Sequence, residues 1–182
     1  MTYCSDCGAT TEWQVPPDDN RPRHICSACH TIHYENPKII CGCLVTYNDQ
    51  VLLCRRAIEP RHGLWTLPAG FMENGETAAE GALRETWEEA MARPTLQGLY
   101  ALTSIPYISQ VYMIFRATLD APEHAPGPES LETQLFTADQ IPWDELAFQT
   151  VRKTLTQWVQ DQSRGSYPLH EIDITESERA RV

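Results

Sequence analysis

Two pairs of cysteines constrain the fold of the first part of this chain more than any other feature. The first pair is Cys4 and Cys7, and the second is Cys26 and Cys29. Two residues lie between the cysteines of each pair, and 18 residues lie between the two pairs. This spacing is typical of a zinc ribbon, because each tight turn directs two thiolates at one tetrahedral ion. Gly8, directly after the first pair, favours such a turn. We therefore expect a structural Zn²⁺ held by Cys4, Cys7, Cys26 and Cys29.

The composition of residues 1–35 also favours a bound metal. This segment has four of the seven cysteines and few aliphatic side chains. It therefore cannot bury enough apolar surface to fold without a stabilising cross-link such as a bound metal ion. Only two arginines lie between the cysteine pairs, against three acidic residues, which favours a structural or dimer-forming module over a nucleic-acid contact. Three histidines are surplus to a four-cysteine site: His24, His30 and His33. Three further cysteines are expected in the core: Cys41, Cys43 and Cys54.

Charge and hydropathy exclude other classes of protein. The chain has 182 residues and a formal net charge of −11, which disfavours nucleic acid as a partner but allows an anionic substrate if metal ions mediate the contact. The longest apolar stretch, residues 39–45, is far shorter than the ~20 residues of a membrane span. The N-terminus has no basic start or apolar signal core. With seven cysteines, these features predict a cytoplasmic protein without a membrane partner.

The pattern of apolar residues predicts a mixed α/β domain after the ribbon. Strands are expected over residues 38–47, 51–56, 96–104, 109–119 and 131–137, and helices over residues 77–92 and 144–160. Residues 161–182 are polar, so we expect a loosely held tail. The predicted organisation is a zinc ribbon over 1–35, a second domain over 36–160 and a C-terminal tail over 161–182.

The helix expected over residues 77–92 concentrates negative charge on one face. Glu85, Glu88 and Glu89 are spaced as i, i+3 and i+4, so their carboxylates lie close together. Their mutual repulsion weakens an isolated helix, and a hard divalent cation such as Mg²⁺ or Mn²⁺ would remove it. An acidic run is also common on a solvated helix face, and these three residues alone leave that alternative open.

The longer pattern around this helix resembles the Nudix box, G-x5-E-x7-R-E-U-x-E-E-x-G-U, in which U is a bulky aliphatic residue. Its charged and glycine positions fall in register here at Gly70, Glu76, Arg84, Glu85, Glu88 and Glu89. Together with the ribbon, the Pro-rich stretch 126–132 and Ile141-Pro142-Trp143, nearly the whole chain is similar to zinc-ribbon Nudix hydrolases, which include plant chloroplast FAD/ADP-ribose pyrophosphatases. The resemblance implies an α/β fold, an α/β/α sandwich with a mixed sheet.

The resemblance also implies roles for individual residues. Mg²⁺ or Mn²⁺ would be bound by Glu85, Glu88, Glu89 and the carbonyl of Ala69, while Glu76 and Arg84 would form an ion pair that orients the helix. The catalytic base stays open among Glu85, Glu88 and a loop residue, for which Glu129 is the main candidate and Glu132 a weaker one. Substrate contacts are expected from four residues: Arg55, Arg61, Tyr107 and Phe148. Arg56 is a further candidate.

The implied reaction is hydrolysis of the diphosphate bond of a nucleoside diphosphate derivative by water. FAD, giving FMN and AMP, is the first expectation, and ADP-ribose, giving AMP and ribose 5-phosphate, is the second. Family members that cleave NADH carry an S-Q-P-W-P-F-P-x-S array after the box, whereas residues 104–110 read SIPYISQ, so NADH or another dinucleotide is kept as an alternative. A non-catalytic ligand sensor or scaffold is a second alternative, and a homodimer stays open.

Three positions depart from the box pattern. Met91 replaces the glycine near the helix end, and Thr86 and Ala92 replace bulky aliphatic residues. Either Met91 takes a left-handed backbone at a cost of about 1 kcal/mol, or the helix continues toward Pro94. None of the three departures removes a carboxylate, so we expect them to affect stability rather than activity.

Overall fold

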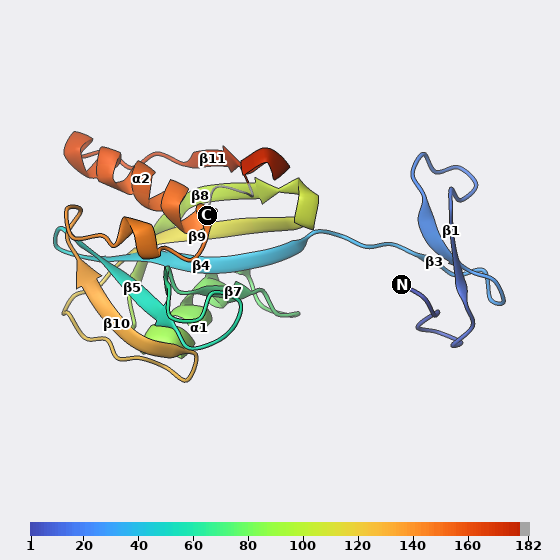
Figure 1. Ribbon diagram of the computed structural model, residues 1–182, viewed down its shortest axis with the longest axis horizontal. Helices are drawn as coiled ribbons and strands as arrows, with labels where there is room; N and C mark the ends of the chain where they lie inside the picture. Colours follow the sequence, from blue (N-terminus) through green and yellow to red (C-terminus); the bar gives the residue numbers. More distant parts are fainter. Residues whose placement is uncertain (179–182) are drawn as a thin grey trace. The chain divides into compact units, whose positions relative to one another are not determined.

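The computed structural model describes residues 1–178. The chain consists of two compact units, Met1–Pro37 and Lys38–Val182. The first unit is a three-stranded antiparallel sheet in the order β1-β2-β3, drawn in blue in Figure 1. Its strands are β1 (Thr11–Gln14), β2 (Arg23–Cys26) and β3 (Ile32–His33).

The second unit is built on a mixed sheet in the order β10-β5-β4-β9-β8-β11, with β6 paired to β5 and β7 paired to β4. β4 runs parallel to β9 and β11 runs parallel to β8, whereas the other pairs are antiparallel. The strands are β4 (Lys38–Tyr47), β5 (Gln50–Arg56), β6 (Trp65–Thr66), β7 (Ala69–Phe71), β8 (Thr95–Ile105), β9 (Gln110–Thr118), β10 (Ser130–Phe136) and β11 (His170–Asp173).

Two helices cover opposite faces of this sheet, α1 (Ala78–Ala90) and α2 (Gln149–Arg164) (Figure 1). The alternation of β4 directs Cys41 and Cys43 into the core cluster beneath α1 and Leu44 into the cluster beneath α2. The expected α/β/α sandwich is therefore confirmed, and the three cysteines outside the ribbon are core residues. No helix within residues 1–178 has the length and apolar character to cross a membrane.

Local sequence fixes both ends of α1. Thr77 caps the start: its hydroxyl accepts the amide hydrogen of Glu80, while the Glu80 carboxylate accepts that of Thr77. The helix ends at Met91, whose φ of 48° is left-handed and whose amide donates to the Trp87 carbonyl. Of the two alternatives for Met91, the structure therefore has the left-handed residue and not a longer helix.

The C-terminal segment differs from the predicted tail. Helix α2 continues to Arg164, and β11 then pairs with β8, so residues 161–178 belong to the domain. The polar composition misled the prediction because the inward residues, Ile172 and Ile174, alternate with charged ones, and Ile174 is buried. Residues 179–182 of the predicted tail lie outside the described residues.

Helix α2 also begins later than expected, at Gln149 instead of residue 144. Leu146 fits the helical period but precedes the helix, because the chain is held to β6 there by a hydrogen bond from Ala147 N–H to the Trp65 carbonyl. The only helical turn in this stretch is a short 3₁₀ segment over Trp143–Glu145.

Candidate active site

The four ribbon cysteines converge on one point. Their sulfur atoms all lie within 4.8 Å of one another. Cys7 Sγ is 3.4 Å from Cys26 Sγ and 3.5 Å from Cys29 Sγ, and Cys4 Sγ is 3.7 Å from Cys29 Sγ. Tetrahedral Zn²⁺ with Zn–S bonds of about 2.3 Å requires sulfur separations of about 3.8 Å. The donor set and its spacing therefore fit a structural zinc ion.

The backbone around the cysteines supports this arrangement. The turn after each pair ends in a left-handed residue, Gly8 with φ 76° and His30 with φ 59°. A hydrogen bond with the Thr31 hydroxyl lowers the pKa of the Cys29 thiol to about 6, which favours the thiolate that binds metal. His33 Nε2 lies 3.3 Å from Cys4 Sγ, so this histidine contacts a sulfur atom. Within residues 1–178, however, the converging group of ligand atoms consists of the four cysteines and includes no histidine.

Arg84 organises the acidic face of α1. Its Nε and Nη2 donate to the two carboxylate oxygens of Glu76 at 3.0 and 2.8 Å. Its Nη1 donates to Glu85 at 2.7 Å and to Glu88 at 3.0 Å, and its Nη2 also donates to the Phe71 carbonyl at 3.1 Å. The bidentate hydrogen bond from Arg84 lowers the pKa of Glu76 to about 2. Arg84 therefore ties the loop before α1 to the acidic face of the helix.

Glu89 is the most deeply buried carboxylate of the cluster. Its side chain lies below the surface, and its Oε2 accepts a hydrogen bond of 3.2 Å from Ala69 N–H on β7. Burial raises the pKa of Glu89 to about 8, and the nearby Glu85 and Glu129 add to this effect. Burial likewise raises the pKa of Glu85. Both carboxylates are therefore in an environment that penalises negative charge without a cation.

Two glycines leave room for this cluster. A Cβ atom at Gly70 would lie 2.3 Å from the Glu85 carboxylate, and one at Gly127 would lie 1.7 Å from the Glu88 carbonyl oxygen. Gly127 N–H donates to the Glu89 carbonyl at 3.0 Å, so the Pro-rich loop caps the C-terminal end of α1. The glycines thus allow β7 and this loop to approach the acidic helix closely.

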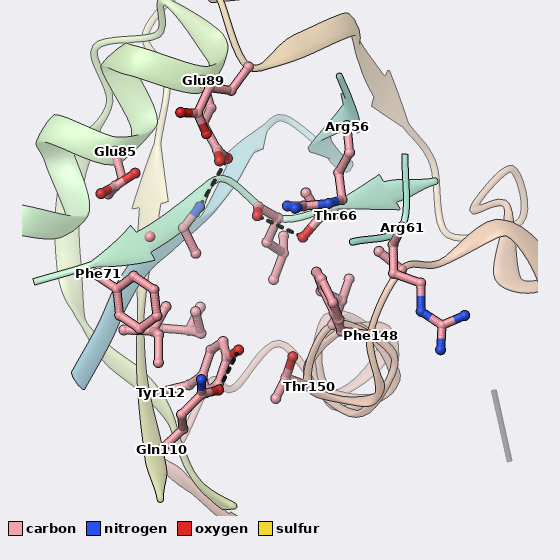
Figure 2. A pocket seen from close by; sticks show the side chains of 18 of the residues that line it. Arg56, Arg61, Thr66, Phe71, Glu85, Glu89, Gln110, Tyr112, Phe148 and Thr150 are labelled. Carbon is pink, nitrogen blue, oxygen red and sulfur yellow. Dashed lines mark hydrogen bonds between the residues drawn. The ribbon is translucent and has the colours of Figure 1, made fainter. Parts of the chain in front are cut away.

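The acidic face of α1 lines a cavity of about 1050 Å³ that extends toward the start of α2 (Figure 2). Six glutamates line it: Glu59, Glu73, Glu85, Glu88, Glu89 and Glu129. The Arg56 guanidinium lies 5.1 Å from the centre of the Phe148 ring in the same cavity. One end of the cavity is therefore acidic, and the other is bordered by aromatic and aliphatic side chains.

The structure brings most of the expected site residues to this cavity. Glu85, Glu88, Glu89, Glu129, Ala69, Arg61, Tyr107 and Phe148 all line it. Among the described residues, the compact ligand group is that of the four cysteines, whereas Arg84 donates hydrogen bonds to two of the glutamates, Glu85 and Glu88. Figure 2 shows Arg56 directed toward the cavity and Arg61 directed away from it.

Arg55, an expected substrate contact, does not reach the cavity. It lies outside the residues that line the cavity; its Nε donates to the Gly63 carbonyl at 2.9 Å and its Nη1 lies 3.6 Å from Glu132. Adjacent residues of a strand point to opposite faces, so Arg56 faces the cavity and Arg55 does not. Strand alternation alone could have separated the two arginines. Tyr112, Gln110 and Thr150, which also line the cavity, carried no sequence signal.

The sandwich, the acidic helix and the cavity between its helices define a Nudix-type hydrolase domain. The chain belongs to the Nudix family: the family model described as the NUDIX domain matches residues 37–159, and the model described as Nudix N-terminal, a zinc ribbon, matches residues 2–35. Nudix hydrolases act with a divalent metal ion.

Individual relatives are of two kinds. NAD-capped RNA hydrolase NudC of Photorhabdus laumondii is 30% identical over 151 residues, which are 79% of this chain and 52% of NudC. The chain thus spans about half the length of the NudC relatives that it matches. ADP-ribose pyrophosphatase of Methanocaldococcus jannaschii is 28% identical over 119 residues, which are 63% of this chain and 69% of that protein.

A solved structure matches more completely. The crystal structure of a NUDIX hydrolase from Nitrosomonas europaea is 49% identical, covers 97% of this chain and 100% of its own, and superposes with a TM-score of 0.93. The zinc ribbon and the Nudix sandwich therefore occur together in a close structural relative.

Proposed function

We propose that this chain hydrolyses the diphosphate bond of a nucleoside diphosphate derivative, with FAD and ADP-ribose as the first candidate substrates. The observation that carries the proposal is the cavity of about 1050 Å³, whose acidic end is formed by the box glutamates and whose other end is largely apolar. Ligand sites commonly enclose about 300–1,000 Å³, so a nucleotide with a second ring or sugar has enough room.

Glu85, Glu88 and Glu89 would hold Mg²⁺ or Mn²⁺, with the carbonyl of Ala69 as a further candidate ligand. Oxygen donors suit these ions, and two of the carboxylates have pKa values raised by burial, so a cation would relieve an unfavourable environment. A bound divalent ion lowers the pKa of water and neutralises charge on phosphate oxygens. The proposal covers both ions, Mg²⁺ and Mn²⁺.

The chain's own residues would orient this cluster and accept a proton. Arg84 and Glu76 hold the acidic face of α1 against the loop before it. Glu129 is our candidate for the base that takes a proton from the attacking water, because it lines the cavity and its backbone is fixed by a 2.8 Å hydrogen bond from Ala57 N–H. Glu85 and Glu88 are the alternatives. Glu132 is a weaker candidate because it lies close to Arg55.

The rest of the substrate would lie along the wall opposite α1. Arg56 offers a positive charge beside the cavity, stacked on the Phe148 ring, and suits a contact with the diphosphate. Tyr107 and Phe148 offer aromatic surface for a ring. This distribution favours a substrate with a charged centre and a weakly polar end.

NAD-capped RNA is a second candidate substrate, favoured by the similarity to NudC over 79% of this chain. The net charge of −11 disfavours RNA as a partner. The panel that distinguishes the candidates contains FAD, ADP-ribose, NADH and NAD-capped RNA, each incubated with Mg²⁺ or Mn²⁺, and AMP or decapped RNA is measured.

Release of AMP from FAD or ADP-ribose is the expected result. Hydrolysis of capped RNA alone would favour the second candidate. Tight binding of one compound without hydrolysis of any would contradict the proposal and favour a ligand sensor. Omission of the divalent ion is the control, because activity without it would contradict the proposed role of the glutamates.

A further inference from the structure

Arg55 lies near the end of β5 and connects the chain segments on both sides of this strand. Its neighbours across the two ladders are Trp65 on β6 and Glu132 on β10. On the β6 side, Arg55 Nε donates to the Gly63 carbonyl at 2.9 Å. On the β10 side, its Nη1 lies 3.6 Å from Glu132 Oε2. One guanidinium group therefore bridges two segments that are far apart in the sequence.

Both of the bridged segments line the cavity. We use the name β5–β6 loop for residues 57–64, which contribute four lining residues: Ile58, Glu59, Pro60 and Arg61. The other segment is the Pro-rich loop before β10, which contributes Pro128 and Glu129. Ala57 N–H donates to the Glu129 carbonyl at 2.8 Å. The two segments are therefore also joined directly at the residue that we propose as the base.

The β5–β6 loop is held in a strained conformation. Arg61 has a left-handed backbone with a φ of 71°, which disfavours residues other than glycine. Such strain persists where the surrounding contacts fix the chain. Arg55 supplies one of these contacts through Gly63, and Arg56 Nε donates to the Pro60 carbonyl at 2.9 Å. Because adjacent residues of a strand point to opposite faces, the loop is clamped from both faces of β5.

Strand β10 departs from regular pairing directly after Glu129. Its register against β5 shifts between Ser130 and Glu132, so Leu131 is an extra residue in the ladder. Such a bulge disrupts the ladder locally and changes the direction of nearby side chains. The contact between Glu132 and Arg55 lies just beyond the bulge. It therefore holds β10 at the point where the regular ladder begins.

The two contacts of Arg55 differ in strength. The side chains of Arg55 and Glu132 are 42% and 47% exposed, so water screens their attraction. The hydrogen bond to the Gly63 carbonyl is partly buried and has a charged donor, so it contributes more. Arginine suits this double role because its nitrogen atoms form a rigid planar fork, whereas lysine has a single nitrogen atom.

We propose that Arg55 is a positioning residue, which fixes Glu129 at the cavity by bridging the β5–β6 loop and the start of β10. The proposal rests on the proposed function, because it takes Glu129 as the base that accepts a proton from the attacking water. Arg55 does not line the cavity, so it acts through Glu129 and not on the substrate. Loss of the bridge should therefore lower turnover more than substrate affinity.

The test compares Arg55→Gln, which removes the charge and the fork, with Arg55→Lys, which keeps the charge on one nitrogen atom. Lys153→Gln is the matched control, because Lys153 also bridges a carbonyl and a carboxylate, those of Asp173 and Glu178, and does not line the cavity. AMP release from the hydrolysed substrate gives kcat and KM. Amide hydrogen exchange over residues 57–64 is measured without any ligand.

We expect Arg55→Gln to lower kcat about tenfold while KM stays within about threefold. Arg55→Lys should lie between this variant and the wild type. In a Glu129→Gln background, Arg55→Gln should have almost no further effect, because both changes remove the same function. Amide exchange over residues 57–64 should be about tenfold faster in Arg55→Gln. Lys153→Gln should match the wild type in kcat, KM and exchange over these residues.

Three results would overturn the proposal. They are wild-type kcat of Arg55→Gln or of Glu129→Gln, additive losses of kcat in the double variant, and unchanged amide exchange over residues 57–64 in Arg55→Gln. The two proposals fail separately. If the wild type hydrolyses no compound of the panel but Arg55→Gln exchanges faster over residues 57–64, the bridge stands and the function fails. Hydrolysis by the wild type, with kcat and exchange unchanged in Arg55→Gln, means the reverse.

Discussion

Replacing Gly70 by alanine should displace the Glu85 carboxylate while leaving the fold intact. The new Cβ would lie 2.3 Å from Glu85 Oε2, where ordinary contact begins at 3.4 Å, so the carboxylate must move by about 1 Å. The atoms that must move are the end of a flexible side chain, and Gly70 is not among the residues with a left-handed backbone. The melting temperature should therefore change little.

The consequence for catalysis is larger, because a misplacement of about 1 Å in a catalytic group can lower turnover ~10²-fold. We expect Gly70→Ala to lose about that factor in kcat and to bind Mg²⁺ or Mn²⁺ more weakly. The assays are AMP release under saturating substrate, titration calorimetry with the metal, and a thermal melt.

Gly75→Ala is the matched control with the opposite signature. Its Cβ would meet no atom within 4 Å, but its φ of 91° is left-handed, so alanine should cost about 1 kcal/mol of stability and leave kcat unchanged. A Gly70→Ala protein with wild-type kcat and metal affinity would refute the assignment of Glu85 to the metal cluster.

Three further predictions follow from named residues. Burial raises the pKa of Glu89 to about 8, and a cation binds only the ionised carboxylate, so Mg²⁺ affinity should rise with pH and level off above about pH 8. Calorimetry at several pH values measures this affinity. An affinity that does not change with pH would argue against Glu89 as a ligand. Met91→Gly should remove about 1 kcal/mol of left-handed strain, raising the melting temperature by a few degrees with unchanged turnover, and a loss of activity would show that Met91 has another role. Elemental analysis should find one Zn²⁺ per chain, and Cys26→Ser should lose it and become protease-sensitive within residues 1–37; a protease-resistant ribbon without zinc would contradict the metal-stapled fold.

Elements with a strong local pattern could be predicted from the sequence. The strand expected over residues 38–47 matches β4, because a long apolar run has few alternative conformations besides a buried strand. Helix α1 begins after Thr77, whose capping box with Glu80 is written in the sequence. The cysteine spacing likewise predicted which sulfurs converge.

Features that depend on packing could not be predicted. β11 contributes only one apolar residue, Ile172, and it is ordered because it pairs with the edge of β8. Leu146 continues the helical period, but tertiary contacts hold it outside α2.

The central claim is that the α1 carboxylates hold a catalytic metal ion for diphosphate hydrolysis. The most direct test is the turnover of Glu88→Gln and Glu89→Gln, measured as AMP release with the hydrolysed substrate. Glu80→Gln is the control on the same helix, since glutamine retains the capping box. We predict a loss of ~10²-fold or more for the two variants with folded protein in the thermal melt, and wild-type turnover of Glu80→Gln. Near wild-type rates in both Glu88→Gln and Glu89→Gln would contradict the account.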